Sequence, residues 1–170
     1  MTATFYPDQK DFSFYDFRQQ FGLLHDADLI GYLYQDDLLS LEFGDLYWYE
    51  HEFSDKTLYA AYKDFTTCKI QIRCKRDSSD SFFVLLDNHV EMIKDTGMKA
   101  SQKNETYTGS RTYRLNGLDK IDLSDKKAEF LDFGLSIHYL RLNFLLLGKQ
   151  GSDTDMVLKL FPESVTFLWE

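Results

Sequence analysis

Residues 24–55 carry nine carboxylates and neither lysine nor arginine. Carboxylates can act as general acids and bases, ligate cations, or attract a basic partner. Aromatic residues are interleaved with these acids, and rigid aromatic side chains often anchor the centre of a protein interface. The residues that we expect to contact a partner are Asp36, Asp37, Glu42, Asp45, Tyr47, Trp48, Tyr49, Glu50, Glu52 and Asp55.

Metal chemistry is the first possibility for this stretch. An adjacent His-Asp pair such as His25-Asp26 occurs in metal phosphohydrolases, but the other three histidines show no ligand spacing around it. Asp26 could instead begin a calcium loop, in which Gly31 fits the sixth position but Asp37 replaces the required glutamate at the twelfth. We therefore expect no metal site and no cofactor, and a structural role for His25 and Asp26.

Catalysis is the second possibility. Glycoside hydrolysis needs two carboxyl groups at a set separation, which a sequence does not supply. The chain has no glycine-rich phosphate loop and no nucleophile elbow. We expect that the protein is not an enzyme, and one alternative stays open. A small-ligand-binding or hydrolytic domain would use an aromatic-lined pocket in which carboxylates orient a cationic or polyhydroxyl ligand.

The charge distribution favours a protein partner. The net charge is −9, and residues 1–55 hold 12 of the 28 acids but only 2 of the 19 lysines and arginines. This balance argues against binding to nucleic acid or to an anionic membrane surface. An acidic, aromatic-rich surface suits a basic protein, although the acids could instead only solvate an edge hairpin and prevent its pairing with other chains.

The chain shows no membrane or export signal. No apolar run approaches the roughly 18 residues of a membrane span, and the N-terminus has no basic region followed by an apolar core. Cys68 and Cys74 lie roughly 20 Å apart along an extended strand, too far for a disulfide. We expect both to be buried free thiols in a cytoplasmic protein.

The first third of the chain predicts a helix and a hairpin. Residues 7–21 favour a helix capped by Ser13, with Phe14, Phe17 and Phe21 on one apolar stripe and Gly22 at its end. Residues 28–43 alternate between apolar and polar positions around a polar turn at 35–37, which predicts a β-hairpin.

The rest of the chain reads mainly as strands, at residues 57–65, 67–75, 81–86, 111–115 and 134–147. Residues 124–131 favour a short helix, and residues 156–169 a closing hairpin whose turn is set by Pro162. Residues 87–110 fit a helix, a strand or a loop. We predict one α+β domain over 1–170, with a mainly antiparallel sheet of about eight strands, an N-terminal helix and room for one further short helix.

The run LLHDADLIGYLYQDDLLSLEF, residues 23–43, resembles the opening of small bacterial immunity proteins of polymorphic and contact-dependent toxin systems. In these proteins a Leu-His-Asp-Ala segment leads into a hairpin of alternating apolar residues. The resemblance implies a cytoplasmic toxin inhibitor that binds and blocks one cognate basic toxin domain, often a nuclease, in a contact-dependent growth inhibition system. It implies no catalytic residue. We expect a monomer, with a homo-oligomer as the other possibility.

Overall fold

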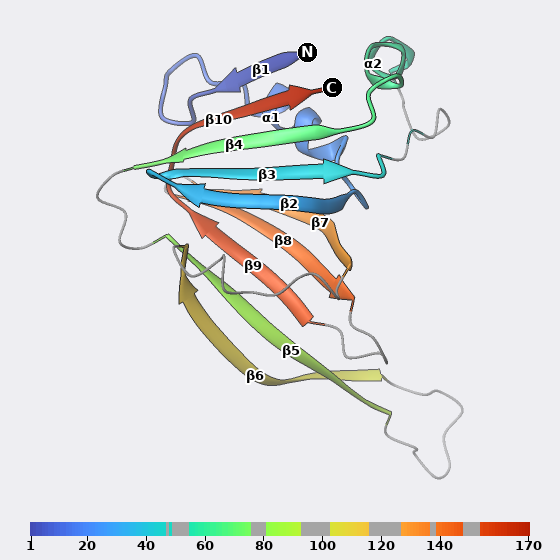
Figure 1. Cartoon of the computed structure of the whole chain (residues 1–170), viewed down its shortest axis with the longest axis vertical. Coiled ribbons are helices and arrows are strands. Elements are labelled where there is room, and N and C mark those ends of the chain that lie inside the picture. The colour runs from blue at the N-terminus through green and yellow to red at the C-terminus, as the bar shows by residue number, and fades with distance from the viewer. Residues whose placement is uncertain are drawn as a thin grey trace.

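A computed structural model of the chain describes residues 1–46, 48, 55–75, 81–92, 103–115, 127–136, 139–147 and 154–170, with only the backbone described at 82–92 and 103–114. Figure 1 shows the helices and strands that lie in these ranges. In chain order they are β1 (Thr2–Phe5), α1 (Phe14–Gly22), β2 (Asp28–Gln35), β3 (Leu38–Gly44), α2 (Lys56–Tyr62), β4 (Cys68–Cys74), β5 (Phe82–Met92), β6 (Lys103–Arg114), β7 (Lys127–Leu135), β8 (Leu140–Leu147), β9 (Thr154–Leu160) and β10 (Pro162–Trp169).

The strands form one sheet in the order β1-β10-β4-β3-β2-β7-β8-β9-β5-β6, and all neighbouring pairs are antiparallel. The predicted α+β class with a mainly antiparallel sheet is therefore confirmed. The described residues contain ten strands where about eight were expected. No helix within the described ranges is long and apolar enough to cross a membrane.

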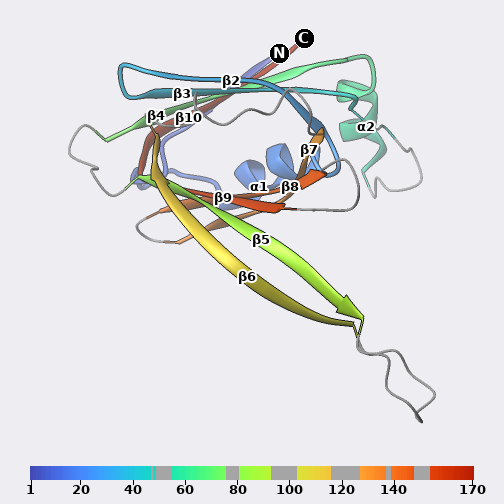
Figure 2. The ribbon, with the colours of Figure 1, turned by 60° about the horizontal axis from the view of Figure 1, so that its bottom comes forward.

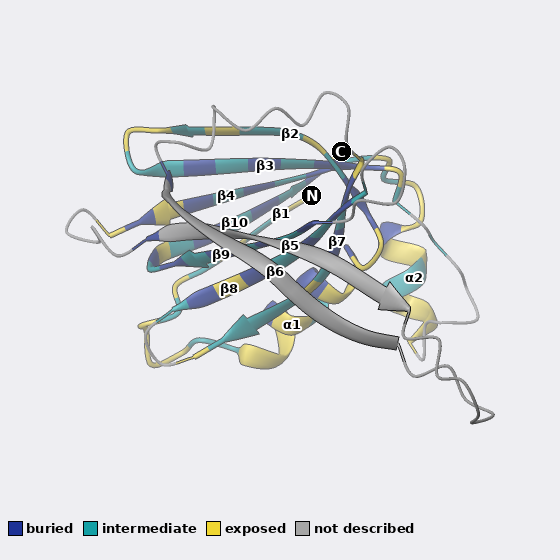
Figure 3. Ribbon diagram, turned by 90° about the horizontal axis from the view of Figure 1, so that it is seen from below, coloured by how far each residue is buried: buried dark blue, intermediate teal, exposed yellow. Residues whose placement is uncertain are grey.

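The sheet bends sharply between β2 and β7. Only one ladder pair, Asp28 with Glu129, joins these two strands, and beside it the amide of Asp26 donates to the carbonyl of Phe130 at 3.0 Å. Figures 2 and 3 show that β1, β10, β4, β3 and β2 (the first half-sheet) lie across from β8 and β9. The strands β7, β8, β9, β5 and β6 are the second half-sheet.

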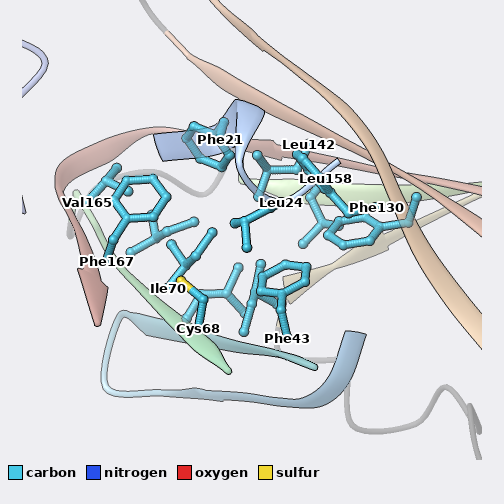
Figure 4. Packing of buried hydrophobic residues seen from close by; sticks show 14 of the residues in the cluster. Phe21, Leu24, Phe43, Cys68, Ile70, Phe130, Leu142, Leu158, Val165 and Phe167 are labelled. Carbon is cyan, nitrogen blue, oxygen red and sulfur yellow. The ribbon is translucent and has the colours of Figure 1, made fainter. Parts of the chain in front are cut away.

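The core fills the space between the two half-sheets (Figure 4). Phe21 of α1 and Leu24, just after this helix, point into it (Figure 4). Each half-sheet contributes alternate residues of its strands, as expected for strands with one buried face. The buried side chains labelled in Figure 4 on the two half-sheets are Phe43, Cys68, Ile70, Val165, Phe167, Phe130, Leu142 and Leu158.

The N-terminal helix has the predicted cap but is shorter than the predicted span of residues 7–21, because residues 7–13 are turn or irregular and α1 starts at Phe14. The Ser13 hydroxyl oxygen accepts a hydrogen bond from the backbone N–H of Asp16, and α1 ends at Gly22. Phe17 and Phe21 are fully buried, but Phe14 is 49% exposed. The prediction of a three-residue apolar stripe is therefore wrong at Phe14, which lies about two helical turns, or 10 Å, from Phe21 and beyond the core.

The second helix lies where a strand was expected. Residues 56–62 form α2, and the Asp55 carboxylate caps it by accepting from the amides of Thr57 (2.8 Å) and Leu58 (3.4 Å). Two alanines inside the segment, Ala60 and Ala61, have the highest helix propensity of any residue. The cap and the alanines outweigh the apparent alternation of residues 57–65.

Residues 127–131 also differ from the prediction. They belong to β7 and not to the short helix expected over 124–131, while residues 124–126 lie outside the described ranges. Residues 87–92 and 103–110 are strand residues of β5 and β6. Of the three structures that residues 87–110 fit, these two parts adopt the strand, and residues 93–102 lie outside the described ranges.

The predicted closing hairpin is absent. β9 pairs with β8 and β5, whereas β10 pairs with β4 and β1. Phe161 alone separates the two strands, and one residue is too few to reverse a chain, since the shortest common hairpin loops have two. Phe161 instead forms a corner: its carbonyl accepts from the amide of Lys75 at 2.9 Å, and its amide donates to the Ser81 hydroxyl at 3.3 Å.

Strand β4 follows the predicted alternation, with Cys68, Ile70, Ile72 and Cys74 all buried. Both cysteines are free thiols, as expected. Burial raises the pKa of the Cys68 thiol, and it raises the pKa of Cys74 to about 11 even though a hydrogen bond with Ser81 opposes the shift.

These thiols make the free energy of unfolding fall at alkaline pH. Because each folded pKa lies above the unfolded value near 9, the unfolded chain loses its thiol protons first, so stability is lost as pH rises from 9 towards 11. Urea titrations at pH 8 and pH 10 should differ by about 2–3 kcal/mol from the two thiols together. In the Cys68→Ala/Cys74→Ala variant, the difference in unfolding free energy between the two pH values should shrink. An unchanged pH dependence would show that these two thiols do not cause the loss of stability.

Candidate functional site

The outward face of the first half-sheet is nearly neutral. Glu42 lies opposite Lys69 in the β3–β4 ladder, and its carboxylate is 3.9 Å from the lysine ammonium, with both side chains nearly half exposed. An exposed pair of this kind contributes no more than about 1 kcal/mol, but it cancels the charge of Glu42 locally. The central row across this face is uncharged and consists of Leu33, Ser40, Gln71, Thr166 and Thr4.

Two of the predicted site residues form the β2–β3 turn. Asp36 and Asp37 have φ values of 52° and 62°, the left-handed geometry of a two-residue type I′ turn. Asp36 is exposed. Asp37 accepts a weak hydrogen bond from the Tyr34 hydroxyl at 3.4 Å, and its carbonyl accepts from the amide of Cys74 at 2.8 Å. The turn is therefore tied to β4 while its carboxylates stay near solvent.

A second group of carboxylates lies at the opposite end of the hairpin, where Asp28 pairs with Gly44. Asp26 and Asp45 are exposed, with φ values of 64° and 48°. The Asp26 carboxylate is 2.9 Å from Nδ1 of His25, and both side chains are more than half exposed. Within the described ranges, no cluster of three or more His, Cys, Asp or Glu residues could hold a metal ion.

Asp28 has a different role from these exposed acids. It is buried at the junction of the half-sheets, and its Oδ1 lies 3.0 Å from Nζ of Lys127, close enough for an ion pair but not aligned as a hydrogen bond. Lys127 begins β7. The ion pair therefore links β2 to β7 where the ladder supplies only one residue pair, and Asp28 belongs to the fold more than to a surface.

The structure assigns fold roles to two further predicted site residues. Trp48 is half-buried: its indole N–H donates to the carbonyl of Phe65 at 2.9 Å, and its ring lies 6.0 Å from that of Trp169. Trp48 therefore packs against the core and does not stand out as an exposed anchor. Asp55 is exposed but caps α2. The remaining predicted residues, Tyr47, Tyr49, Glu50 and Glu52, lie outside the described residues.

The four exposed or half-exposed turn aspartates share one unusual property. They are the only residues other than glycine with positive φ in the described part of the chain. Left-handed backbone is unfavourable for most L-residues by about 1–2 kcal/mol, and glycine or asparagine is the common solution. Aspartate tolerates it, but asparagine makes the same local hydrogen bonds without a charge. Turn geometry alone does not explain why all four carry a carboxylate. The four are Asp26, Asp36, Asp37 and Asp45.

This candidate site, which we call the aspartate turns (Asp26, Asp36, Asp37 and Asp45), differs from the predicted one. Asp26 was predicted to be only structural, and its positive φ is not readable from the sequence. Within the described part of the chain, no lysine or arginine forms an ion pair with Asp26, Asp36 or Asp45. No protein-family model, curated protein or solved structure matches this chain.

The β2–β3 turn offers a direct test of this strain. The variant Asp36→Asn/Asp37→Gly installs the residues most favoured in a type I′ turn and should raise the free energy of unfolding by about 1 kcal/mol. The control Asp36→Asn/Asp37→Ala removes the same charges but keeps a Cβ in left-handed backbone. This control should therefore lower the free energy of unfolding by about 1 kcal/mol. Urea denaturation measures both, and equal shifts would mean that charge, not backbone geometry, sets the stability here.

Proposed function

We propose that this protein binds and neutralises a cationic protein domain, as the immunity proteins that its first hairpin resembles bind their toxins. The observation that carries the proposal is that, among the described residues of the acidic stretch, the four non-glycine residues with left-handed backbone all carry a carboxylate. Where the backbone is strained and folding does not require the charge of the side chain, a function for that charge is the natural hypothesis. A cationic partner supplies one, because exposed negative charge accelerates and orients its approach.

The spacing of the aspartate turns suits a protein partner. Asp26 and Asp45 lie at one end of the β2–β3 hairpin, and Asp36 and Asp37 lie at the other. Strand β2 has eight residues, so the two ends are about 25 Å apart at roughly 3.3 Å per residue. A standard interface buries about 800 Å² on each partner, which is broad enough to touch both ends. A small anion-binding or cation-binding pocket would not span that length.

The compartment that we propose is the bacterial cytoplasm. Free, buried cysteines are the usual state in a reducing compartment. A cytoplasmic inhibitor would meet its toxin after that toxin enters the cell or before it leaves. The expected partner is a basic domain, often a nuclease, encoded beside the inhibitor.

The proposal is tested by expressing the basic domain encoded by the neighbouring reading frame, alone and together with this protein. Growth arrest by the domain alone, relief on co-expression and a 1:1 complex on size-exclusion chromatography would support it. If the purified proteins elute separately and co-expression gives no relief, the proposal is wrong: this protein does not bind that basic domain, and its acidic surface does not serve that purpose.

A second candidate function is small-ligand binding. A cleft of about 600 Å³ is lined by Pro7, Asp8, Phe12, Leu135 and Ser136, and its volume is in the range of ligand pockets. The Asp8 carboxylate at its margin lies 2.6 Å from Nζ of Lys75. A thermal-shift screen with metals, sugars and nucleotides separates the two functions, because a rise of several degrees that Phe12→Ala abolishes would favour the cleft.

A further inference from the structure

Two large aliphatic side chains on the outward face of β2 lie outside the hydrophobic core. Ile30 is 57% exposed and Leu33 is 59% exposed, whereas the other leucines of the hairpin are buried or half-buried. Single exposed apolar residues are common on protein surfaces. This pair differs because a backbone irregularity places Ile30 outward.

The irregularity is a β-bulge between Leu29 and Gly31. Leu29 pairs with Phe43 and Gly31 pairs with Glu42, so Ile30 is left over without a partner in β3. Leu29 pairs with the buried Phe43 and faces inward, whereas Gly31 pairs with the half-exposed Glu42 and faces outward. Counted back from Tyr32, which pairs with the buried Leu41, regular alternation would place Ile30 on the inward face, but the bulge leaves it 57% exposed. Bulges often redirect a side chain next to a functional site.

Small residues around the pair leave these side chains standing above the surface. The side chain of Ile30 lies over Gly44, where an added Cβ would be only 3.2–3.3 Å from its carbons. Gly31 lies between Ile30 and Leu33 in the strand, and Ser40 lies opposite Leu33. Leu33 is the only apolar member of its otherwise polar row. The two side chains therefore project from a surface of small or polar residues.

Carboxylates lie at both ends of the strand that carries this apolar pair, because the aspartate turns lie at the two ends of the hairpin. Glu42, beside Gly31, adds no net charge because it pairs with Lys69. An interface commonly has an apolar centre and a polar rim. Here the rim is acidic at the two ends of the hairpin, so the complementary surface has an apolar depression with lysine and arginine side chains on two sides.

We propose that Ile30 and Leu33 are the apolar anchor by which this protein holds its partner, and that the partner is a cationic protein face with an apolar depression. This inference rests on the proposed function and assigns separate roles in binding to the aspartate turns and to the apolar anchor. The aspartate turns govern how fast the partner arrives, because long-range charge acts on association. The anchor governs how long the partner stays, because buried apolar contacts act mainly on dissociation.

The test uses the full chain and the basic domain encoded by the neighbouring reading frame, with rates measured by surface plasmon resonance. The variant Ile30→Ser/Leu33→Ser should increase the dissociation rate about 100-fold and change the association rate less than about threefold. The matched control Phe14→Ser/Tyr15→Ser removes two other exposed side chains, 49% and 69% exposed on α1, and should leave both rates unchanged. Urea denaturation of each variant checks that it is folded.

The outcomes separate the anchor from the proposed function. If the complex forms and Ile30→Ser/Leu33→Ser dissociates at the wild-type rate, the anchor is wrong while the proposed function stands. If wild type forms no complex, both are overturned. A wild-type protein that is dimeric in sedimentation, with the Ile30→Ser/Leu33→Ser variant monomeric, would also overturn the anchor, because a second copy would then occupy this face.

Discussion

Replacing Phe21 by alanine is expected to lower the free energy of unfolding by about 3–5 kcal/mol. Phe21 is 1% exposed and contacts both half-sheets. Its ring stacks on Phe133 of β7, with centroids 4.5 Å apart, and meets the edge of Phe167 of β10 at 5.0 Å. The substitution therefore removes a ring that joins α1 to the two halves of the sheet, and leaves a cavity between them.

Phe14 provides the matched control for this prediction. It is the same residue type on the same helix, but it is 49% exposed, so Phe14→Ala should change the free energy of unfolding by less than about 1 kcal/mol. Urea denaturation followed by circular dichroism measures both variants. Losses of similar size would show that α1 does not pack on the sheet in the way described.

The second large effect is expected at Gln20, a buried polar residue of α1. Its side-chain amide nitrogen donates to the hydroxyl of Tyr62 at 2.9 Å, and its carbonyl oxygen accepts from the indole N–H of Trp169 at 2.8 Å. Gln20→Met keeps the volume but leaves that buried indole N–H without an acceptor. The expected loss is about 2–4 kcal/mol, since an unmade buried hydrogen bond is unfavourable by about 1–3 kcal/mol and two are broken.

The adjacent glutamine supplies the control. Gln19 donates to the Tyr15 hydroxyl at 2.9 Å in an exposed pair, where water can replace either partner, so Gln19→Met should change stability by less than about 0.5 kcal/mol. Thermal unfolding monitored by tryptophan fluorescence follows both variants. If Gln20→Met is as stable as wild type, the link from α1 through Gln20 to Tyr62 and Trp169 is not part of the folded state.

Local patterns predicted the elements whose signals lie within a few residues. Ser13 caps α1 as expected, and β4 buries alternate residues. The polar turn at 35–37 joins β2 to β3, and the adjacent aspartates at its centre adopt the geometry that short hairpin loops require. In each case the deciding interaction is local, so the sequence alone carries it.

The error in strand pairing arose where distant segments decide the structure, whereas the error at α2 came from local signals that were overlooked. Strand β10 pairs with β1 and β4 instead of its neighbour β9 because Phe161 is held by Lys75 and Ser81, which are far from it in the sequence. Residues 56–62 look strand-like until the cap at Asp55 is considered together with the alanines that follow it. Long-range pairing does not follow from hydrophobic alternation.

The candidate site was predicted only in part. Excess negative charge identified Asp36, Asp37 and Asp45, but their left-handed backbone and the matching role of Asp26 needed coordinates. Trp48, which was expected to contact a partner, is half-buried and packs near Trp169, and its part in binding stays a prediction. Ile30 looks like one more residue of an alternating strand, and only the β-bulge shows that it faces outward. A bulge has no reliable signature in a single sequence.

The most direct measurement of the central claim is the rate of association of the Asp26→Asn/Asp36→Asn/Asp37→Asn/Asp45→Asn variant with the neighbouring basic domain, compared with wild type in stopped flow across a range of salt. We predict association about 10–100-fold slower than wild type at low ionic strength, converging to within about threefold in 1 M salt, where charges are screened over about 3 Å. Asparagine preserves the turns, so the variant should unfold at wild-type urea concentrations or higher. Equal association rates at low salt would contradict the account, because the aspartates would then have no part in bringing a partner to this protein.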